Sequence, residues 1–198
     1  MQRLPLKPFA ATSLLVLGLL AACVSTLPPG TVPPEWALRL PALQQNADWD
    51  MQGRAAVKVG ARGWQASVDW RQHGANTTVH LAGPLGVGAT LLRLDAQGLS
   101  VNDAPPSRDV VKLLQRHLGF DLPLANLRFW LLGAPDPGLP YTVALNDQDR
   151  AQRLTQAGWQ IDFARYRRAG GDWLPATMTL TRPGVRVRMA IDRWDGVQ

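Results

Sequence analysis

Few side chains in this chain could carry out chemistry, and their spacing is not that of a catalytic site. Cys23 is the only cysteine, so its thiol can be modified covalently but cannot form a disulfide or a multi-cysteine metal site within the chain. The only glutamate, Glu35, lies in a proline-rich segment, which excludes paired-glutamate and His-Glu metalloprotease sites. His73, His80 and His117 lack metal-ligand spacing. We therefore predict no catalysis, no metal site and no separate cofactor.

The surroundings of Cys23 suggest what its thiol does. Cys23 closes the run Leu-Ala-Ala-Cys, after positive charges at Arg3 and Lys7 and an apolar stretch over residues 9–22 of the length of a secretory signal. This stretch is shorter than the roughly 20 apolar residues of a transmembrane helix. The run resembles the lipobox of bacterial lipoproteins, which implies cleavage before Cys23 and covalent diacylglyceryl and N-acyl groups on it. An ordinary signal peptide with an incidental cysteine is the alternative.

The remaining chain is long enough for one domain with a substantial core. We predict a signal peptide over residues 1–22, a lipidated N-terminus and Pro-rich tether over 23–48, and one domain over 49–198. Loss of Arg3 and Lys7 with the signal lowers the net charge from +6 to +4. This moderate charge favours an acidic partner or anionic lipid headgroups but lacks the dense basic clusters of a nucleic-acid binder.

Period-two alternation dominates from residue 49 onward and predicts strands with one buried face. In the clearest case Trp64, Ala66, Val68 and Trp70 alternate with polar residues. Two helices interrupt the strands, one with Ser107 as N-cap and Gly119 at its end, the other over about residues 121–133. The pattern predicts about nine to eleven strands in a curved antiparallel sheet covered by helices. The eight tryptophans either form a large core or line a cavity.

One glycine-rich segment, residues 83–88, has unusual chemistry for a hairpin loop. It places Pro84 and Leu85 at the tip, where polar residues are usual. An exposed Leu85 would act as a hydrophobic probe. The alternative is that Leu85 folds back into the core.

Several short motifs follow one another over about residues 49–195. They are Gly53-Arg54-Ala55 with Trp70; Gly83-Pro84-Leu85-Gly86; Leu122-Pro123-Leu124 with Leu127, Trp130 and Gly133; Gln156-Ala157-Gly158-Trp159 with Tyr166; and Leu174-Pro175 before a basic strand that ends at Trp194. In this order, and with the lipobox, they resemble the LolB family of outer-membrane lipoprotein receptors.

The resemblance implies both a fold and a function. The fold is mainly β (α+β), an open, incomplete antiparallel β-barrel covered by two or three helices, with an apolar cavity. The function is to accept acylated lipoprotein cargo from the periplasmic carrier LolA and to insert it into outer-membrane lipid, from a lipid-anchored position on the periplasmic face. The loop of Pro84, Leu85 and Gly86 would act in membrane insertion.

Face alternation selects the strand residues that we expect to line the cavity. They are Trp64, Val68, Trp70, Val79, Leu81, Leu92 and Leu94. We expect a monomer that binds no nucleic acid. The alternative function is an outer-membrane lipoprotein that binds another apolar ligand, such as lipopolysaccharide or a quinone.

Overall fold

The computed structural model describes residues 34–86 and 88–197. The chain divides into two units, Met1–Thr31 and Val32–Gln198, and the fold described below is that of the second. The predicted signal peptide, Cys23 and the proline-rich segment that follows it lie outside the described residues.

The second unit is built on one antiparallel sheet of ten strands. In chain order they are β1 (Asp48–Val59), β2 (Arg62–His73), β3 (Asn76–Ala82), β4 (Thr90–Asp95), β5 (Gly98–Val101), β6 (Tyr141–Leu145), β7 (Ala151–Gln156), β8 (Trp159–Ala169), β9 (Asp172–Arg182) and β10 (Val185–Asp195). The spatial order is β5-β4-β3-β2-β1-β10-β9-β8-β7-β6. The predicted open, mainly β fold is confirmed, since β5 and β6 form the two edges of the sheet.

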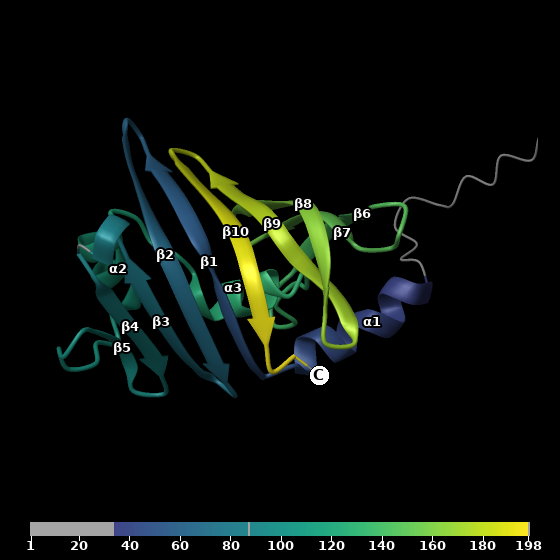
Figure 1. The fold of residues 1–198 in the computed structure, drawn as a ribbon, viewed down its shortest axis with the longest axis horizontal. Helices are drawn as coiled ribbons and strands as arrows, with labels where there is room; N and C mark the ends of the chain where they lie inside the picture. The colour runs from purple at the N-terminus through teal and green to yellow at the C-terminus, as the bar shows by residue number, and fades with distance from the viewer. Residues whose placement is uncertain (1–33, 87, 198) are drawn as a thin grey trace, which may run out of the picture. The chain divides into compact units, whose positions relative to one another are not determined.

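The sheet consists of two meanders that are joined where β1 pairs with β10 (Figure 1). Along both strands every second residue is buried, for example Val57 and its partner Val187. Neighbouring positions face the solvent, so the sheet has an apolar inner face and a polar outer face. The alternation in the sequence predicted this division.

Gly53 lies at an irregularity in the β1–β10 pairing, where the register shifts between Gln52 and Gly53. A Cβ atom at this position would collide with the backbone carbonyl oxygen of Ala190. We expect Gly53→Ala to lower the free energy of unfolding by about 1–3 kcal/mol, a fall in melting temperature of roughly 3–12 °C. Gly171→Ala is the control in thermal unfolding, because a Cβ there meets no atom within 4 Å. An equal effect of both changes would contradict this explanation.

Helices α2 (Val110–Leu118) and α3 (Leu124–Leu131) connect the two meanders and cover the inner face of the sheet (Figure 1). Gly119 ends α2 with a left-handed backbone, as predicted. The N-cap is Asp109 and not Ser107: the Lys112 backbone N–H donates to Asp109 at 3.1 Å. Ser107 instead accepts a hydrogen bond from the Asp109 backbone N–H at 3.2 Å, one step before the helix.

A third helix, α1 (Pro34–Gln45), precedes the sheet in a segment assigned above to the tether. Trp36 and Leu43 of this helix are only 1% and 4% exposed, and Arg39 donates a hydrogen bond to Asp172 at 2.7 Å. Residues 34–48 therefore belong to the packed unit, and the predicted boundary at residue 49 is too late. Pro41 inside the helix is a helix-breaking signal, which explains why the sequence did not indicate α1.

Most tryptophans serve the core and not a cavity. Trp49 stacks on Trp70 with 6.0 Å between ring centroids and meets the edge of Trp194 at 5.3 Å. Trp130 is buried and donates its indole N–H to Gln156 at 2.8 Å. Gln156 in turn donates to the backbone carbonyls of Asp136 and Leu139 at 2.9 and 3.1 Å. The Gln156 motif thus fixes the loop after α3 and has a structural role.

Candidate functional site

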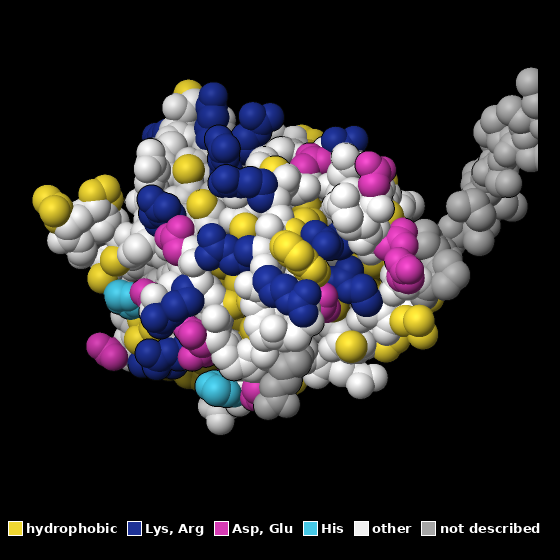
Figure 2. Space-filling model, turned by 45° about the vertical axis from the view of Figure 1, so that its right-hand side comes forward, with side chains coloured by type: hydrophobic (Ala, Val, Ile, Leu, Met, Phe, Trp, Pro, Cys, Tyr) yellow, Lys and Arg dark blue, Asp and Glu magenta, His cyan; other side chains and the backbone are white. Residues whose placement is uncertain are grey.

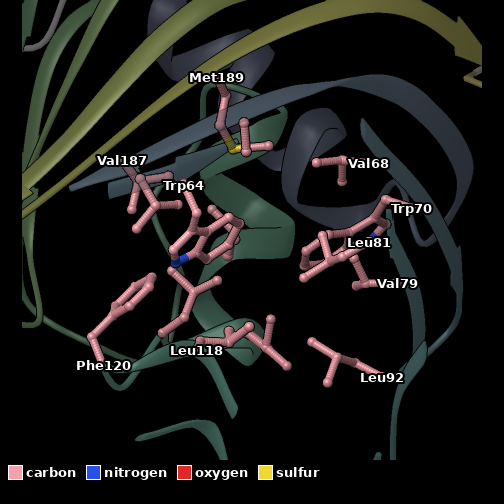
Figure 3. Close-up of a pocket in the computed structure, with 15 residues that line it drawn as sticks. Trp64, Val68, Trp70, Val79, Leu81, Leu92, Leu118, Phe120, Val187 and Met189 are labelled. Carbon is pink, nitrogen blue, oxygen red and sulfur yellow. The ribbon is translucent and has the colours of Figure 1, made fainter. Parts of the chain in front are cut away.

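Apolar side chains from the sheet and from the helical side converge between them in one hollow (Figure 3). All 15 residues that line it are apolar. The sheet contributes six of the seven residues predicted for the cavity, namely Trp64, Val68, Trp70, Val79, Leu81 and Leu92, together with Ala55, Val57, Val187 and Met189. The helical side contributes Leu118, Phe120, Leu122, Leu124 and Leu127. An apolar lining of this kind suits an apolar ligand.

The hollow is small in this structure, with a volume of about 40 Å³. Ligand pockets usually measure about 300–1,000 Å³, so an acyl chain does not fit between the described residues as they are placed here. In this conformation the apolar cavity that the resemblance implies is represented only by this small hollow. Because the sheet is a continuous hydrogen-bonded layer, the helical side is the part whose displacement would open the hollow.

Leu94 does not line this hollow, contrary to the prediction. It contributes instead to a second depression of about 260 Å³, which Val110 and Leu114 of α2 also line. Leu122 and Leu124 line both hollows. Leu94 therefore lies beside the start of α2.

The sequence analysis missed the helical half of the lining. Leu118 directly precedes Gly119, the residue predicted to end α2, and Leu122, Leu124 and Leu127 occur in the quoted motifs. Face alternation alone assigns strand residues to a cavity, so it gives no reason to select residues from helices. Only the packing of α2 and α3 on the inner face brings them to Trp64 and Leu81.

The loop between β3 and β4 holds Leu85 away from the core. A short 3-10 turn spans Pro84–Gly86, closed by a hydrogen bond from the Gly86 N–H to the Gly83 carbonyl at 2.9 Å. The Leu85 side chain is 103% exposed, so the alternative that it folds back is wrong. Its φ of 59° is left-handed, a conformation that costs a non-glycine residue about 1–3 kcal/mol. The loop therefore presents an apolar side chain to its surroundings at an energetic cost.

An ion pair ties the connection between α2 and α3 to the sheet. Arg182 of β9 donates to both carboxylate oxygens of Asp121, one of them at 2.9 Å. These hydrogen bonds hold the pKa of Asp121 below its ordinary value of 3.8, although partial burial opposes the shift. Asp121 stands between Phe120 and Leu122, which both line the hollow. The pair thus positions part of the helical side.

We expect Asp121→Asn to lower the free energy of unfolding at neutral pH by about 0.5–1 kcal/mol, because the pair is partly exposed. The folded-state pKa of Asp121 is lowered, so the pair stabilises the fold above the ordinary pKa, and this contribution is lost as the pH falls through the lowered folded-state pKa. Urea unfolding at pH 7 and near pH 3 should therefore show a smaller difference from the parent protein at the lower pH. Asp103→Asn, an exposed change, is the control. A difference of equal size at both pH values would contradict a role for the charge.

The described residues contain no cluster of side chains suited to holding a metal ion. No group of three or more His, Cys, Asp and Glu side chains that could hold a metal occurs in residues 34–86 and 88–197. His73 and His80 lie on exposed strand positions, 3.3 Å from Asp48 and 4.0 Å from Asp69. Among the described helices, none is both long and apolar enough to cross a bilayer. What the site offers is apolar contact.

Comparison with known proteins first defines the fold and then the family. A LolA superfamily protein from Nitrosomonas europaea has a similar fold, with a TM-score of 0.50 over 83% of this chain and 93% of that chain and 9% sequence identity. The family model for outer membrane lipoprotein LolB matches residues 47–194. The chain therefore belongs to the LolB family.

Individual relatives agree with this assignment over most of their length. The outer-membrane lipoprotein LolB of Nitrosococcus oceani is 34% identical, covering 91% of this chain and 94% of the relative. That of Thiobacillus denitrificans is 32% identical, covering 88% and 91%. These names support a role in outer-membrane lipoprotein localisation, and nothing in the comparisons supports lipopolysaccharide or a quinone as the ligand.

Proposed function

We propose that this protein accepts acylated lipoproteins from the periplasmic carrier LolA and inserts them into the outer membrane. The observation that carries the proposal is the hollow on the inner face, whose 15 lining residues are all apolar. Membership of the LolB family supports the choice of cargo. The cargo's acyl chains would occupy the hollow once the helical side moves away from the sheet.

The energetics of acyl chains explain why such a receptor needs no ATP, cofactor or catalytic group. Burial of acyl chain is worth about 0.8 kcal/mol per methylene, so a cargo with several long chains would pay tens of kcal/mol to cross water alone. Direct passage from one apolar surface to another avoids this cost. Release into a bilayer is favourable because the acceptor is itself a hydrocarbon phase.

Anchoring completes the proposal. Cys23, carrying diacylglyceryl and N-acyl groups, would hold the monomeric receptor on the periplasmic face of the outer membrane. We expect Cys23→Ala to leave acceptance of cargo unchanged, since the folded unit begins near residue 32. The variant should deliver lipoproteins to inner and outer membrane fractions alike, as measured by fractionation of a labelled cargo. A loss of acceptance would contradict a purely anchoring role.

A transfer assay tests the proposed function directly. Purified protein should accept an acylated lipoprotein from its complex with LolA, detected by co-purification, and the same lipoprotein without acyl chains should not compete. Competition by the non-acylated form would show that the receptor recognises the polypeptide, and would overturn the proposal.

A further inference from the structure

The outer face of the sheet carries a compact group of exposed basic residues that the proposed function does not use. This basic cluster consists of Lys58, Arg186 and Arg188, from β1 and β10. Figure 2 shows Lys and Arg side chains gathered from the ends of the β1–β2 and β9–β10 hairpins down the middle of this face. The opposite face is the one that α2 and α3 cover.

The strand register brings these three charges together. Lys58 pairs directly with Arg186, and Arg188 pairs with Ala56, two residues before Lys58. Because adjacent strands lie about 4.8 Å apart, the three side chains start from an area only about 10 Å across. Like charges directly opposite one another are destabilising, so this arrangement has a cost for the fold.

Carboxylates do not offset this cost among the described residues. No ion pair or hydrogen bond involves the side chains of the basic cluster in residues 34–86 and 88–197, and the next outward positions on β9 are Thr179 and Thr181. Five arginines elsewhere on the same unit have acidic partners: Arg39 with Asp172, Arg54 with Asp192, Arg153 with Asp162, Arg182 with Asp121 and Arg193 with Asp195. The basic cluster is therefore free to bind an external anion.

The Leu85 loop borders the same outer surface. An open hollow of about 440 Å³ is lined on one side by Pro84, Leu85 and Gly86, and on the other by outward residues that include Gln65. Gln65 pairs with Ala56, which is the partner of Arg188 on the other side. Only two strand spacings thus separate this wall of the hollow from the basic cluster. The surface combines a protruding apolar side chain with a group of positive charges.

We propose that the basic cluster binds the phosphate groups of anionic lipid headgroups and holds this outer face against the membrane while Leu85 reaches the hydrocarbon. A fully exposed leucine beside the charges favours a lipid surface over an acidic protein, since a bilayer offers both phosphates and hydrocarbon. A single apolar contact gives weak, reversible binding, and a basic patch is the usual second contribution. The proposal rests on the proposed function only for the role of the Leu85 loop.

Vesicle binding without cargo tests the proposal. The mature chain, residues 23–198 with Cys23→Ser, would be sedimented with vesicles of phosphatidylglycerol and phosphatidylethanolamine, and with vesicles of phosphatidylcholine alone. Each basic residue near an anionic surface strengthens binding roughly fivefold, so Arg186→Gln with Arg188→Gln should weaken binding to the anionic vesicles about 25-fold. Binding of the parent chain should fall strongly at about 0.5 M NaCl, where screening is short-ranged, and should be weak for phosphatidylcholine.

Two matched variants distinguish an effect of charge at this site from an effect of net charge and from an effect of misfolding. Arg186→Lys with Arg188→Lys keeps the charges and should bind like the parent chain. Lys112→Gln with Arg116→Gln removes the same charge from exposed positions on α2, on the other side of the sheet, and should also bind like the parent chain. Equal melting temperatures of all variants confirm that each is folded.

Unchanged binding of the Arg186→Gln, Arg188→Gln variant, or equal loss in the α2 variant, would overturn the proposal. Unchanged vesicle binding with a specific loss of cargo acceptance from LolA would also overturn it and would make the basic cluster a docking surface for the carrier. Failure of this proposal can be distinguished from failure of the proposed function, because vesicle binding is measured without LolA or cargo. If the proposed function were wrong, the basic cluster would still bind lipid although the protein transferred no cargo.

Discussion

Leu85→Glu is expected to leave acceptance of acylated cargo unchanged and to slow its insertion into liposomes about 10- to 100-fold. Transfer of a leucine side chain from water to hydrocarbon is worth about 1.5–3 kcal/mol, and a carboxylate forfeits all of it. Leu85 makes no contribution to the core, since it is 103% exposed. The fold and the hollow on the inner face should therefore be unaffected. The measurement is a two-stage assay of acceptance from LolA followed by insertion.

Two further variants make this result specific to the loop. Leu85→Gly removes the apolar side chain and relieves the left-handed φ of 59°, so it should impair insertion in a protein at least as stable as the parent. Leu38→Glu changes another exposed leucine, 78% exposed on α1, and should insert normally. Loss of acceptance together with insertion in the Leu85 variants would indicate misfolding and contradict a role confined to the membrane step.

Leu81→Asp is expected to weaken binding of acylated cargo by about 2–4 kcal/mol, or roughly 30- to 1,000-fold. Leu81 lines the hollow and is only partly buried, so the carboxylate would meet an acyl chain without a hydrogen-bonding partner. The fold should tolerate the change better than it would at the fully buried positions. Co-purification of the variant with a labelled lipoprotein measures the effect.

The neighbouring residue supplies the control. His80→Asp places the same side chain one position earlier on β3, on the exposed outer face, and should bind cargo normally. Equal binding by the two variants would show that the inner face does not hold the acyl chains. Trp70 would be a poorer test, although it also lines the hollow: it is 2% exposed and stacks on Trp49, so a charge there would unfold the domain.

The two predictions concern opposite surfaces of the same sheet. Leu81 faces α2 and α3, whereas Leu85 belongs to a loop that borders the outer face. The protein can therefore hold cargo on one side and contact a membrane on the other, and a substitution can affect one step without the other. Independent effects of Leu81→Asp and Leu85→Glu would follow directly from this separation.

Some parts of the structure were predictable because their signals are local. Alternation along residues such as Trp64 to Trp70 depends only on the pleat of a strand, and it identified six of the ten sheet residues in the lining. Gly119 ended α2 as expected because a left-handed residue after a helix favours glycine. Pro84 and the glycines around Leu85 likewise indicated a tight loop with Leu85 at its tip, although the pattern alone left open whether the side chain is exposed.

Other parts were not predictable because they depend on segments far apart in the sequence. Trp36 and Leu43 of α1 are buried only because the helix packs against the sheet, and Pro41 gave the opposite local signal. Leu94 was expected in the hollow, yet it lines a second depression beside Val110 and Leu114 of α2. A local sequence pattern does not indicate where a helix will pack on the sheet.

The sequence by itself determined which residues form strands, which side of each strand is apolar, the place of Leu85 at a loop tip and membership of the LolB family. The tertiary structure decided three things: the nearly closed hollow of about 40 Å³, the inclusion of α1 in the packed unit, and the meeting of Lys58 with Arg186 across the β1–β10 pairing. The physical reason is that local chemistry sets backbone conformation and face, whereas pairing register and helix packing set distances between segments that are remote in the chain.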